Sequence, residues 1–510
     1  MRTEKSIKNS IAAILMNIIT MIIGFIAQAL FIRILGAEYL GLNGLFSNIL
    51  SMLSIAELGI GSAIIFNLYK PLAENDIKKI NNLMRFYKKA YNIIFFVVLG
   101  LGILILPFLK HIVRDVSIPV NVTLVYILFL GSSLSSYVLS YKRSILYADQ
   151  KKYIINYIHI IYLLILNCSQ LAIIYFTKNY YAYLVLKIVC QLIENIIISS
   201  IVNRRYTFLN VKESNELDKN MRKSIFTKMK GLIFHKVGAF LVWGTDNILI
   251  STFFGVISVG IYSNYSLIIN AMTNLFYQLI NATTASIGNL LVERNKEKSF
   301  ETFEKIDFIN FCIVTWSAIT FLLVVQIFIT LWVGNQYILP LPIVIVLVIS
   351  YYQKMMRSTY DTFKEAAGIW HEDRFVPILE SIINISASVI LLKLFGMIGV
   401  FLGTIVSGFV VWFYSYPKYV YRMIFDKDVK SYYKKNVKYF IIFIFIGIVA
   451  LTLAHFVTIK NIWVRFFSYL FIGAIIPILL ITIIFKKNKN FNYLKQLILS
   501  KFNKYIRHSI

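Results

Sequence analysis

Long apolar runs, each about long enough to cross a bilayer, follow one another along this 510-residue chain. A helix needs about 20 apolar residues to cross the hydrocarbon core, and it satisfies its own backbone hydrogen bonds there. Only 15% of the residues are charged, against about 25% in a typical soluble domain. The sequence therefore predicts an all-α polytopic membrane protein with about 14 transmembrane helices. The expected spans are 10–34, 42–69, 90–109, 120–141, 154–176, 181–202, 231–253, 258–288, 308–332, 340–362, 375–395, 398–419, 439–458 and 462–485.

The distribution of basic residues tests this map. Lys and Arg number 52 against 24 Asp and Glu, a net charge of +28. If the N-terminus is cytoplasmic, 43 of the 52 basic residues fall in segments on the inner side. Basic residues collect in cytoplasmic loops, where they set topology and meet anionic lipid. We therefore expect a multi-pass protein of the cytoplasmic cell membrane, with both termini in the cytoplasm and no nucleic-acid partner.

The longest connection between spans is a basic segment that divides the chain. We predict a cytoplasmic linker at 204–230, between an N-terminal six-helix bundle at 1–203 and a C-terminal six-helix bundle at 231–420. Two extra transmembrane helices at 421–485 and a basic cytoplasmic tail at 486–510 complete the organisation. The first apolar run is long enough to span, and no cleavable signal peptide is evident.

A weak internal repeat follows the same division. Both predicted outer turns carry two glycines five residues apart: Gly36 and Gly41 after the first span, and Gly255 and Gly260 after the seventh. The inner loop at 149–153 resembles the loop at 371–375. Two pseudo-symmetric six-helix bundles would fit this pattern, and such repeats build transporters with a site between the halves.

Polar side chains recur at helical spacing in the first, second and eighth spans. A polar stripe inside a membrane lines either a partner helix or a water-filled cavity. The first span carries Gln28, and the eighth carries Asn270 and Asn274. For a single polar residue, helix packing is the simpler explanation. The stripe in the eighth span continues over about five turns, and there we favour a hydrated cavity.

Ionisable side chains inside the spans are the second set of candidates. A charge at the bilayer centre costs at least about 2.5 kcal/mol, so it is rarely idle. Lys236, beside His235, could hold a phosphate as a point charge. The carboxylates of Asp246 and Glu57 suit a proton or sodium switch. Arg33 lies near the outer end of the first span, close enough to the interface to snorkel.

Two other charges, Lys187 and Glu194, have two equally weighted explanations, helix pairing and function. They are seven residues apart and share a face of the sixth span, and a third charge, Glu380, lies in the first turns of the eleventh. The three cysteines lie in apolar runs without a Cys/His cluster, and the chain has no HExxH and no Walker A sequence. We therefore expect no metal or cofactor, and no ATP-driven pump in this chain by itself.

Several blocks of the sequence resemble a known family. They are Phe31–Gly44, Ala56–Gly61, His235–Lys236, Thr245–Ile250, Val259–Ser263, Ala367–Arg374 and Gly396–Thr404. On these blocks the chain resembles the Wzx-type polysaccharide/oligosaccharide flippases of the MATE-like MOP exporter superfamily. The resemblance implies two six-helix bundles around a cavity lined mainly by spans 1, 2, 7 and 8. It also implies a non-enzymatic protein that flips undecaprenyl-diphosphate-linked oligosaccharide from the inner to the outer leaflet for surface polysaccharide synthesis.

The same resemblance suggests roles for the candidate residues and for partners. By family analogy, cationic cavity residues bind the diphosphate, and an ion gradient or the membrane potential drives alternating access. The expected substrate-binding residues are Lys236, Arg33, His235, Asn270, Asn274 and Gln28, and the expected ion-coupling residues are Asp246 and Glu57. Membrane lipid and the polymerase and glycosyltransferases of the same pathway are expected partners.

Two other functions stay open on the sequence. The drug/cation antiporters of the superfamily usually have an acidic site in the first half, and Glu57 keeps that alternative open. A polysaccharide polymerase-type enzyme would need a sizeable outer loop with catalytic residues, and no predicted outer loop exceeds about a dozen residues. Lipid II flippases carry arginines in the first helix, whereas Thr20–Gln28 has no basic residue, which argues against a lipid II substrate.

Overall fold

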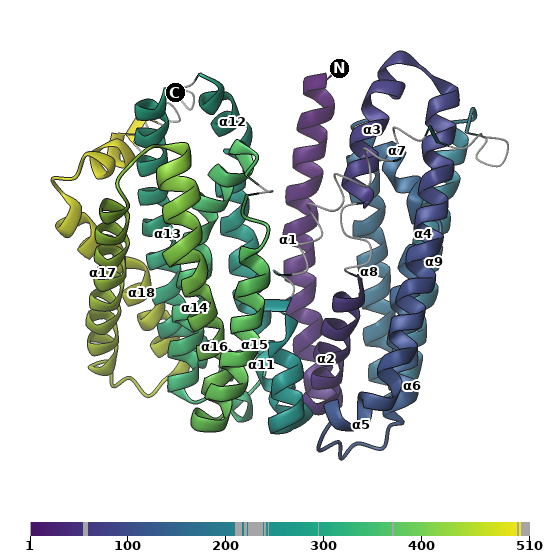
Figure 1. Ribbon diagram of the computed structural model, residues 1–510. Helices are drawn as coiled ribbons and strands as arrows, with labels where there is room; N and C mark the ends of the chain where they lie inside the picture. Colours follow the sequence, from purple (N-terminus) through teal and green to yellow (C-terminus); the bar gives the residue numbers. More distant parts are fainter. Residues whose placement is uncertain are drawn as a thin grey trace, which may run out of the picture. The chain divides into compact units, whose positions relative to one another are not determined.

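The computed structural model describes residues 2–54, 60–209, 244–293, 295–369, 372–496 and 499–500, with a few isolated residues between 217 and 242. The described chain is helical throughout, and it contains no strand. It forms two compact units, Met1–Asn264 and Tyr265–Ile510, which we describe separately (Figure 1). The predicted all-α class is confirmed.

The described part of the first unit contains nine α-helices and the start of α11. They are α1 (Arg2–Leu35), α2 (Ala37–Leu53), α3 (Ile60–Glu74), α4 (Ile77–Ile105), α5 (Leu109–Ile112), α6 (Val122–Tyr137), α7 (Arg143–Ala148), α8 (Lys152–Thr177), α9 (Tyr180–Arg205) and the first part of α11 (Asp246–Asn281). Short 3-10 turns lie at Leu106–Phe108 and Ser140–Lys142. The main packing pairs are α1 with α8, α6 with α9, and α8 with α9.

The second unit contains the rest of α11 and the C-terminal helices. They are α12 (Thr284–Val292), α13 (Lys296–Trp332), α14 (Leu341–Ala367), α15 (Val376–Phe395), α16 (Met397–Val410), a π-helix (Val411–Ile424), α17 (Val429–His455) and α18 (Ile462–Phe485), with a 3-10 turn at Asn335–Tyr337. The long α13 packs against α14, α17 and α18. Pro417 lies inside the π-helix, where its missing N–H removes one helical hydrogen bond.

Eleven of the described helical segments are long and apolar enough to cross a membrane. The second predicted span corresponds to α2 and α3, which have 17 and 15 residues, and residues 55–59 between them lie outside the described chain. The tenth corresponds to α14, which has enough length but carries charges such as Lys354, Arg357 and Asp361. The count of 14 and the cytoplasmic termini therefore stay predictions.

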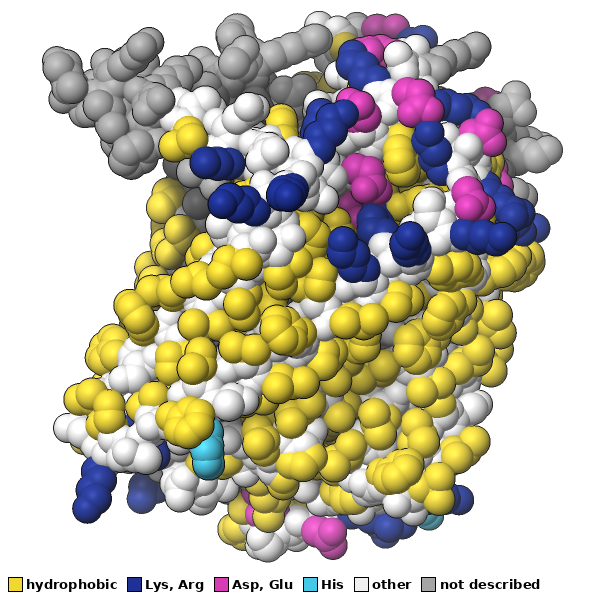
Figure 2. Space-filling view, turned by 90° about the vertical axis from the view of Figure 1, so that its left-hand side faces the viewer, with side chains coloured by type: hydrophobic (Ala, Val, Ile, Leu, Met, Phe, Trp, Pro, Cys, Tyr) yellow, Lys and Arg dark blue, Asp and Glu magenta, His cyan; other side chains and the backbone are white. Residues whose placement is uncertain are grey.

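Charged side chains gather at one end of the second unit. Figure 2 shows the side that carries α17 and α18, with a broad apolar band below a belt rich in Lys, Arg, Asp and Glu. At the opposite end, the described basic residues of this unit are Lys393, Lys460 and Arg465. A band of apolar side chains beside a basic end is the surface expected of a multi-pass membrane protein.

The compact units do not follow the predicted bundle boundaries residue by residue. They meet at Asn264, inside α11, whereas we predicted a linker at 204–230. Most of that linker lies outside the described residues. The predicted bundles therefore remain a hypothesis about organisation.

Candidate functional site

The two predicted outer turns touch each other through their glycines. Gly36 begins α2 with φ 95°, and Gly255 kinks α11 with φ 79°, backbone conformations that favour glycine. A Cβ on Gly41 would lie 2.0 Å from the carbonyl oxygen of Val256. α2 and this part of α11 therefore cross with their backbones in direct contact.

The contact is reciprocal. A Cβ on Gly260 would lie 2.0 Å from the carbonyl oxygen of Ala37. The residue after each turn glycine thus presses on the second glycine of the other turn. Two copies of one structural repeat related by a pseudo-twofold axis produce this arrangement, because each copy presents the same surface to the other.

Polar contacts hold the neighbouring helices at this crossing. The Gln28 amide on α1 donates to Asn264 Oδ1 on α11 at 2.8 Å, and Asn264 is fully buried. The Glu38 carboxylate at the start of α2 accepts from the Ser117 hydroxyl at 2.8 Å and from the Ile118 N–H at 3.2 Å. The structure thus places one predicted site residue, Gln28, in a helix-to-helix hydrogen bond.

The other described candidates lie on the same two helices. Arg33 has an exposed side chain in the last turn of α1, and Asp246 is buried at the first residue of α11. Asn270 and Asn274 are exposed further along α11, as is Tyr277 in the same stripe. Glu57, His235 and Lys236 lie outside the described residues, so their roles remain predictions.

Glu194 forms the main buried charge pair of the first unit. Its side chain is fully buried, 3.3 Å from Arg143 Nη2 and 3.0 Å from His159 Nδ1. The Gln191 amide donates to its second oxygen at 3.1 Å. Lys187, about two helical turns from Glu194 on α9, lies 5.7 Å above the Phe129 ring. These contacts favour helix packing as the explanation for both charges.

Glu380 is paired in the same way in the second unit. Arg357 Nη2 on α14 donates to Glu380 Oε1 at 2.6 Å and to the Gly408 carbonyl at 3.2 Å, which joins three helices. One turn further along α14, Asp361 accepts from the Tyr416 hydroxyl at 2.9 Å. Lys364 on the same helix pairs with Asp373. This side of α14 is therefore a buried charged face, which hydropathy alone did not reveal.

A second charge cluster that the sequence did not single out joins α13 to α17. Lys435 Nζ lies 2.7 Å from both Glu304 and Asp307, and Asp307 is fully buried. The ammonium also lies over the rings of Phe303 and Tyr421, at 4.7 Å and 5.3 Å. No local feature of the sequence distinguishes Lys435 from the other basic residues at the start of α17.

In each unit, a tyrosine hydroxyl binds the predicted inner loop, 149–153 or 371–375, from near the end of the helix pair that follows that loop. The Tyr206 hydroxyl donates to Asp149 at 2.7 Å, and the Tyr419 hydroxyl donates to the Glu372 carbonyl at 2.8 Å. Burial and the hydrogen bond to Asp149 raise the pKa of Tyr206. The two predicted repeat loops thus share an anchoring device.

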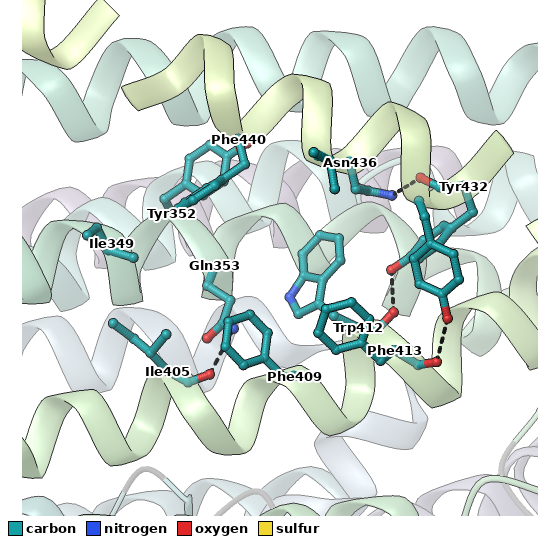
Figure 3. A pocket seen from close by; sticks show the side chains of 12 residues that line it. Ile349, Tyr352, Gln353, Ile405, Phe409, Trp412, Phe413, Tyr432, Asn436 and Phe440 are labelled. Atoms are coloured by element: carbon teal, nitrogen blue, oxygen red, sulfur yellow. Dashed lines mark hydrogen bonds between the residues drawn. The ribbon is translucent and has the colours of Figure 1, made fainter. Parts of the chain in front are cut away.

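A cavity of about 320 Å³ opens between α14, α16, the π-helix and α17 (Figure 3). Aromatic and aliphatic side chains form most of its wall, and the few polar ones are engaged locally: Gln353 donates to the Ile405 carbonyl at 3.0 Å, and Tyr432 to the Trp412 carbonyl at 2.8 Å. Within the described chain, the Trp412 indole N–H has no hydrogen-bond partner. Such a wall suits a hydrocarbon chain better than a sugar.

Comparison with known proteins identifies the family. A family model described as "Polysaccharide biosynthesis protein" matches residues 6–287, more than half of the chain. The chain belongs to this polysaccharide biosynthesis protein family. The match includes α1, α2 and most of α11, the helices of the glycine crossing and of the polar stripe. No curated protein sequence matches the chain.

Solved structures show the same fold at low identity. The structure described as lipid II flippase MurJ in an inward closed conformation superposes with a TM-score of 0.65 at 14% identity, covering 94% of this chain and 99% of that one. An inward-facing multidrug resistance MATE family transporter of the MOP superfamily gives 0.60 at 14% identity, covering 82% and 96%. The family match confirms the predicted link to polysaccharide biosynthesis, and the solved structures confirm a MurJ- and MATE-like fold. The titles of these two structures describe a flippase and a transporter.

Proposed function

We propose that this protein flips undecaprenyl-diphosphate-linked oligosaccharide from the inner to the outer leaflet of the cytoplasmic membrane, for surface polysaccharide synthesis, by alternating access. Membership of the polysaccharide biosynthesis protein family supports the pathway. The MurJ- and MATE-like fold over most of the chain supports a flippase or transporter mechanism.

The observation that carries the proposal is the exposed polar stripe of α11. Asn270 and Asn274 are exposed, within a segment apolar enough to cross a membrane. An amide facing hydrocarbon without a partner costs several kcal/mol, so exposed amides at membrane depth indicate contact with water or a polar ligand. Sugar hydroxyls, which both donate and accept hydrogen bonds, match amide side chains well.

The remaining candidates have complementary roles in this proposal. Lys236, with His235 and Arg33, holds the diphosphate, because a compact ammonium binds phosphate as a point charge. Gln28, Asn270 and Asn274 supply amide groups for the sugars. Asp246 and Glu57 bind the coupling ion, and its uptake changes the charge of the cavity as the transporter cycles.

The prenyl chain of the substrate stays in lipid while the head group crosses. The basic inner loops draw the anionic head group towards the membrane surface. Glycosyltransferases of the same pathway supply the lipid-linked unit before it is flipped, and the polymerase consumes it afterwards.

The test uses a strain that lacks this gene, complemented with variants. Asn270→Leu with Asn274→Leu, and separately Lys236→Ala, should leave undecaprenyl-linked intermediate on the cytoplasmic side and abolish the polysaccharide. Thr452→Leu is the matched control, because it makes the same polar-to-apolar change at an exposed position of α17 outside the stripe.

Normal polysaccharide in the deletion strain, together with altered sensitivity to cationic drugs, would replace this proposal by the multidrug/cation antiporter. Full activity of Lys236→Ala at normal protein levels would remove only the phosphate role of that lysine.

A further inference from the structure

The chain after α18 turns back and packs across the basic end of the second unit. Residues 489–496 are helical. Lys489 pairs with Glu301 on α13 at 2.9 Å, and Lys305 lies 5.1 Å above the Tyr493 ring. The Phe491 ring lies 6.5 Å from that of Phe308. This tail helix, residues 489–496, is therefore attached to α13 by both charged and aromatic contacts.

Under the tail helix lies a hollow of about 350 Å³. Cys312 of α13 and Ile478, Ile481 and Thr482 of α18 line one side, and Phe491, Leu494 and Leu499 line the other. Its wall is almost wholly apolar. Ile478 is 56% exposed, so the hollow opens onto the apolar surface of the unit and not onto its interior.

A single charged side chain, Lys495, belongs to the lining. Its side chain is exposed, and the described residues give it no ion-pair partner. Glu301, an acid that contacts the tail helix, is paired with Lys489 at 2.9 Å and lies 3.9 Å from Lys305. The rim of the hollow therefore carries an excess of positive charge.

Further lysines increase this excess. Lys486 and Lys487 are exposed between α18 and the tail helix. Clusters of lysines next to the end of a transmembrane helix attract anionic lipid head groups, at about 1 kcal/mol for each basic residue near the surface. An apolar hollow that opens to lipid beneath such a rim complements an amphiphile with a hydrocarbon chain and an anionic head.

We propose that this hollow holds an acyl chain of an anionic glycerophospholipid, whose phosphate binds Lys495. A free phosphate would leave the apolar wall empty, and a zwitterionic lipid would bring its own cation to the basic rim. This site is separate from the polar stripe of the proposed function, and it would stand if the transported substrate were different.

The experiment uses Cys312 as a reporter inside the hollow. The full chain with Cys168→Ser and Cys190→Ser keeps Cys312 as its remaining cysteine. Alkylation by N-ethylmaleimide is timed in nanodiscs of phosphatidylcholine alone and of phosphatidylcholine with phosphatidylglycerol. A bound acyl chain covers the thiol, so we expect alkylation to be several-fold slower with phosphatidylglycerol.

Charge reversal at the rim tests the phosphate contact. Lys495→Glu should restore the faster rate, whereas Lys430→Glu, the same charge change at an exposed position of α17 outside the hollow, should not. In native mass spectrometry, the Lys495→Glu variant should retain one phosphatidylglycerol molecule fewer than the Lys430→Glu variant.

Three results would overturn the proposal: equal rates in the two lipid mixtures, protection that persists in Lys495→Glu, or equal protection by undecaprenyl phosphate in phosphatidylcholine. The last would assign the hollow to the prenyl lipid of the substrate. None of these measurements depends on transport, so they separate this proposal from the proposed function.

Discussion

The crossing of the two outer turns makes Gly41 the position where one added methyl group should matter most. An ideal Cβ there lies 2.0 Å from Val256 O and 2.7 Å from Val256 Cγ1, whereas ordinary contacts begin near 3.4 Å. The obstacle is a backbone oxygen, which cannot rotate away, so α2 or α11 must move. Overpacking of this kind costs about 3 kcal/mol at the upper end of its usual range, and the better helix propensity of Ala returns about 1. We expect Gly41→Ala to lose about 2 kcal/mol of stability.

Thermal unfolding of the purified protein in detergent measures this loss. Gly100→Ala is the matched control, because Gly100 lies inside α4 and a Cβ there meets nothing within 4 Å. The control should melt at the same temperature as the wild type or slightly higher, and Gly41→Ala several degrees lower. Gly260→Ala, which meets Ala37 O at 2.0 Å, should behave like Gly41→Ala. Equal melting temperatures for Gly41→Ala and Gly100→Ala would refute the close backbone contact.

Two charge clusters give further predictions, both read from thermal unfolding. Glu194→Ala leaves the largely buried Arg143 without its carboxylate and should cost about 3–5 kcal/mol of stability. The double variant Glu194→Leu with Arg143→Met should recover most of this stability, and a double variant no more stable than the single one would contradict the pairing. Lys435→Met leaves Asp307 buried without a cation and should destabilise the protein far more than Lys434→Met at the exposed neighbouring position. Similar melting temperatures for the two variants would show that the cluster contributes little to stability.

Much of the fold follows from hydropathy, because a membrane span must be both long and apolar. The expected spans 154–176, 181–202, 375–395 and 462–485 agree closely with α8, α9, α15 and α18. The glycine spacing also located the turns at Gly36 and Gly255, since their positive φ values limit which residues fit there. Both features depend only on a short stretch of neighbouring residues, so they can be predicted from the sequence.

The charge clusters could not be predicted in the same way. Arg357 lies near the end of the expected span 340–362 and Lys364 just beyond it, yet both lie on α14 and pair with the acids Glu380 and Asp373. Lys435 is one of seven basic residues between positions 418 and 438, and nothing local distinguishes it from Lys434. Pairing depends on which helices pack together, and hydropathy along one chain carries no information about that.

The glycine crossing and the duplicated loop anchors together constrain how such a protein can move. At the crossing, the carbonyls of Ala37 and Val256 rest directly on Gly260 and Gly41, so gradual sliding would drive backbone into backbone. At the other end of each repeat, a tyrosine holds the inner loop by one hydrogen bond, which is broken far more easily. We therefore expect conformational change to leave the crossing intact or to separate it as a whole, and to begin at the inner loops. A disulfide between Gly44→Cys and Ser263→Cys would join α2 to α11 beside the crossing, because a Cβ on Gly44 would lie 2.7 Å from Ser263 Oγ. A disulfide that forms yet permits full transport would support an intact crossing, and one that blocks transport would show that the crossing separates in every cycle.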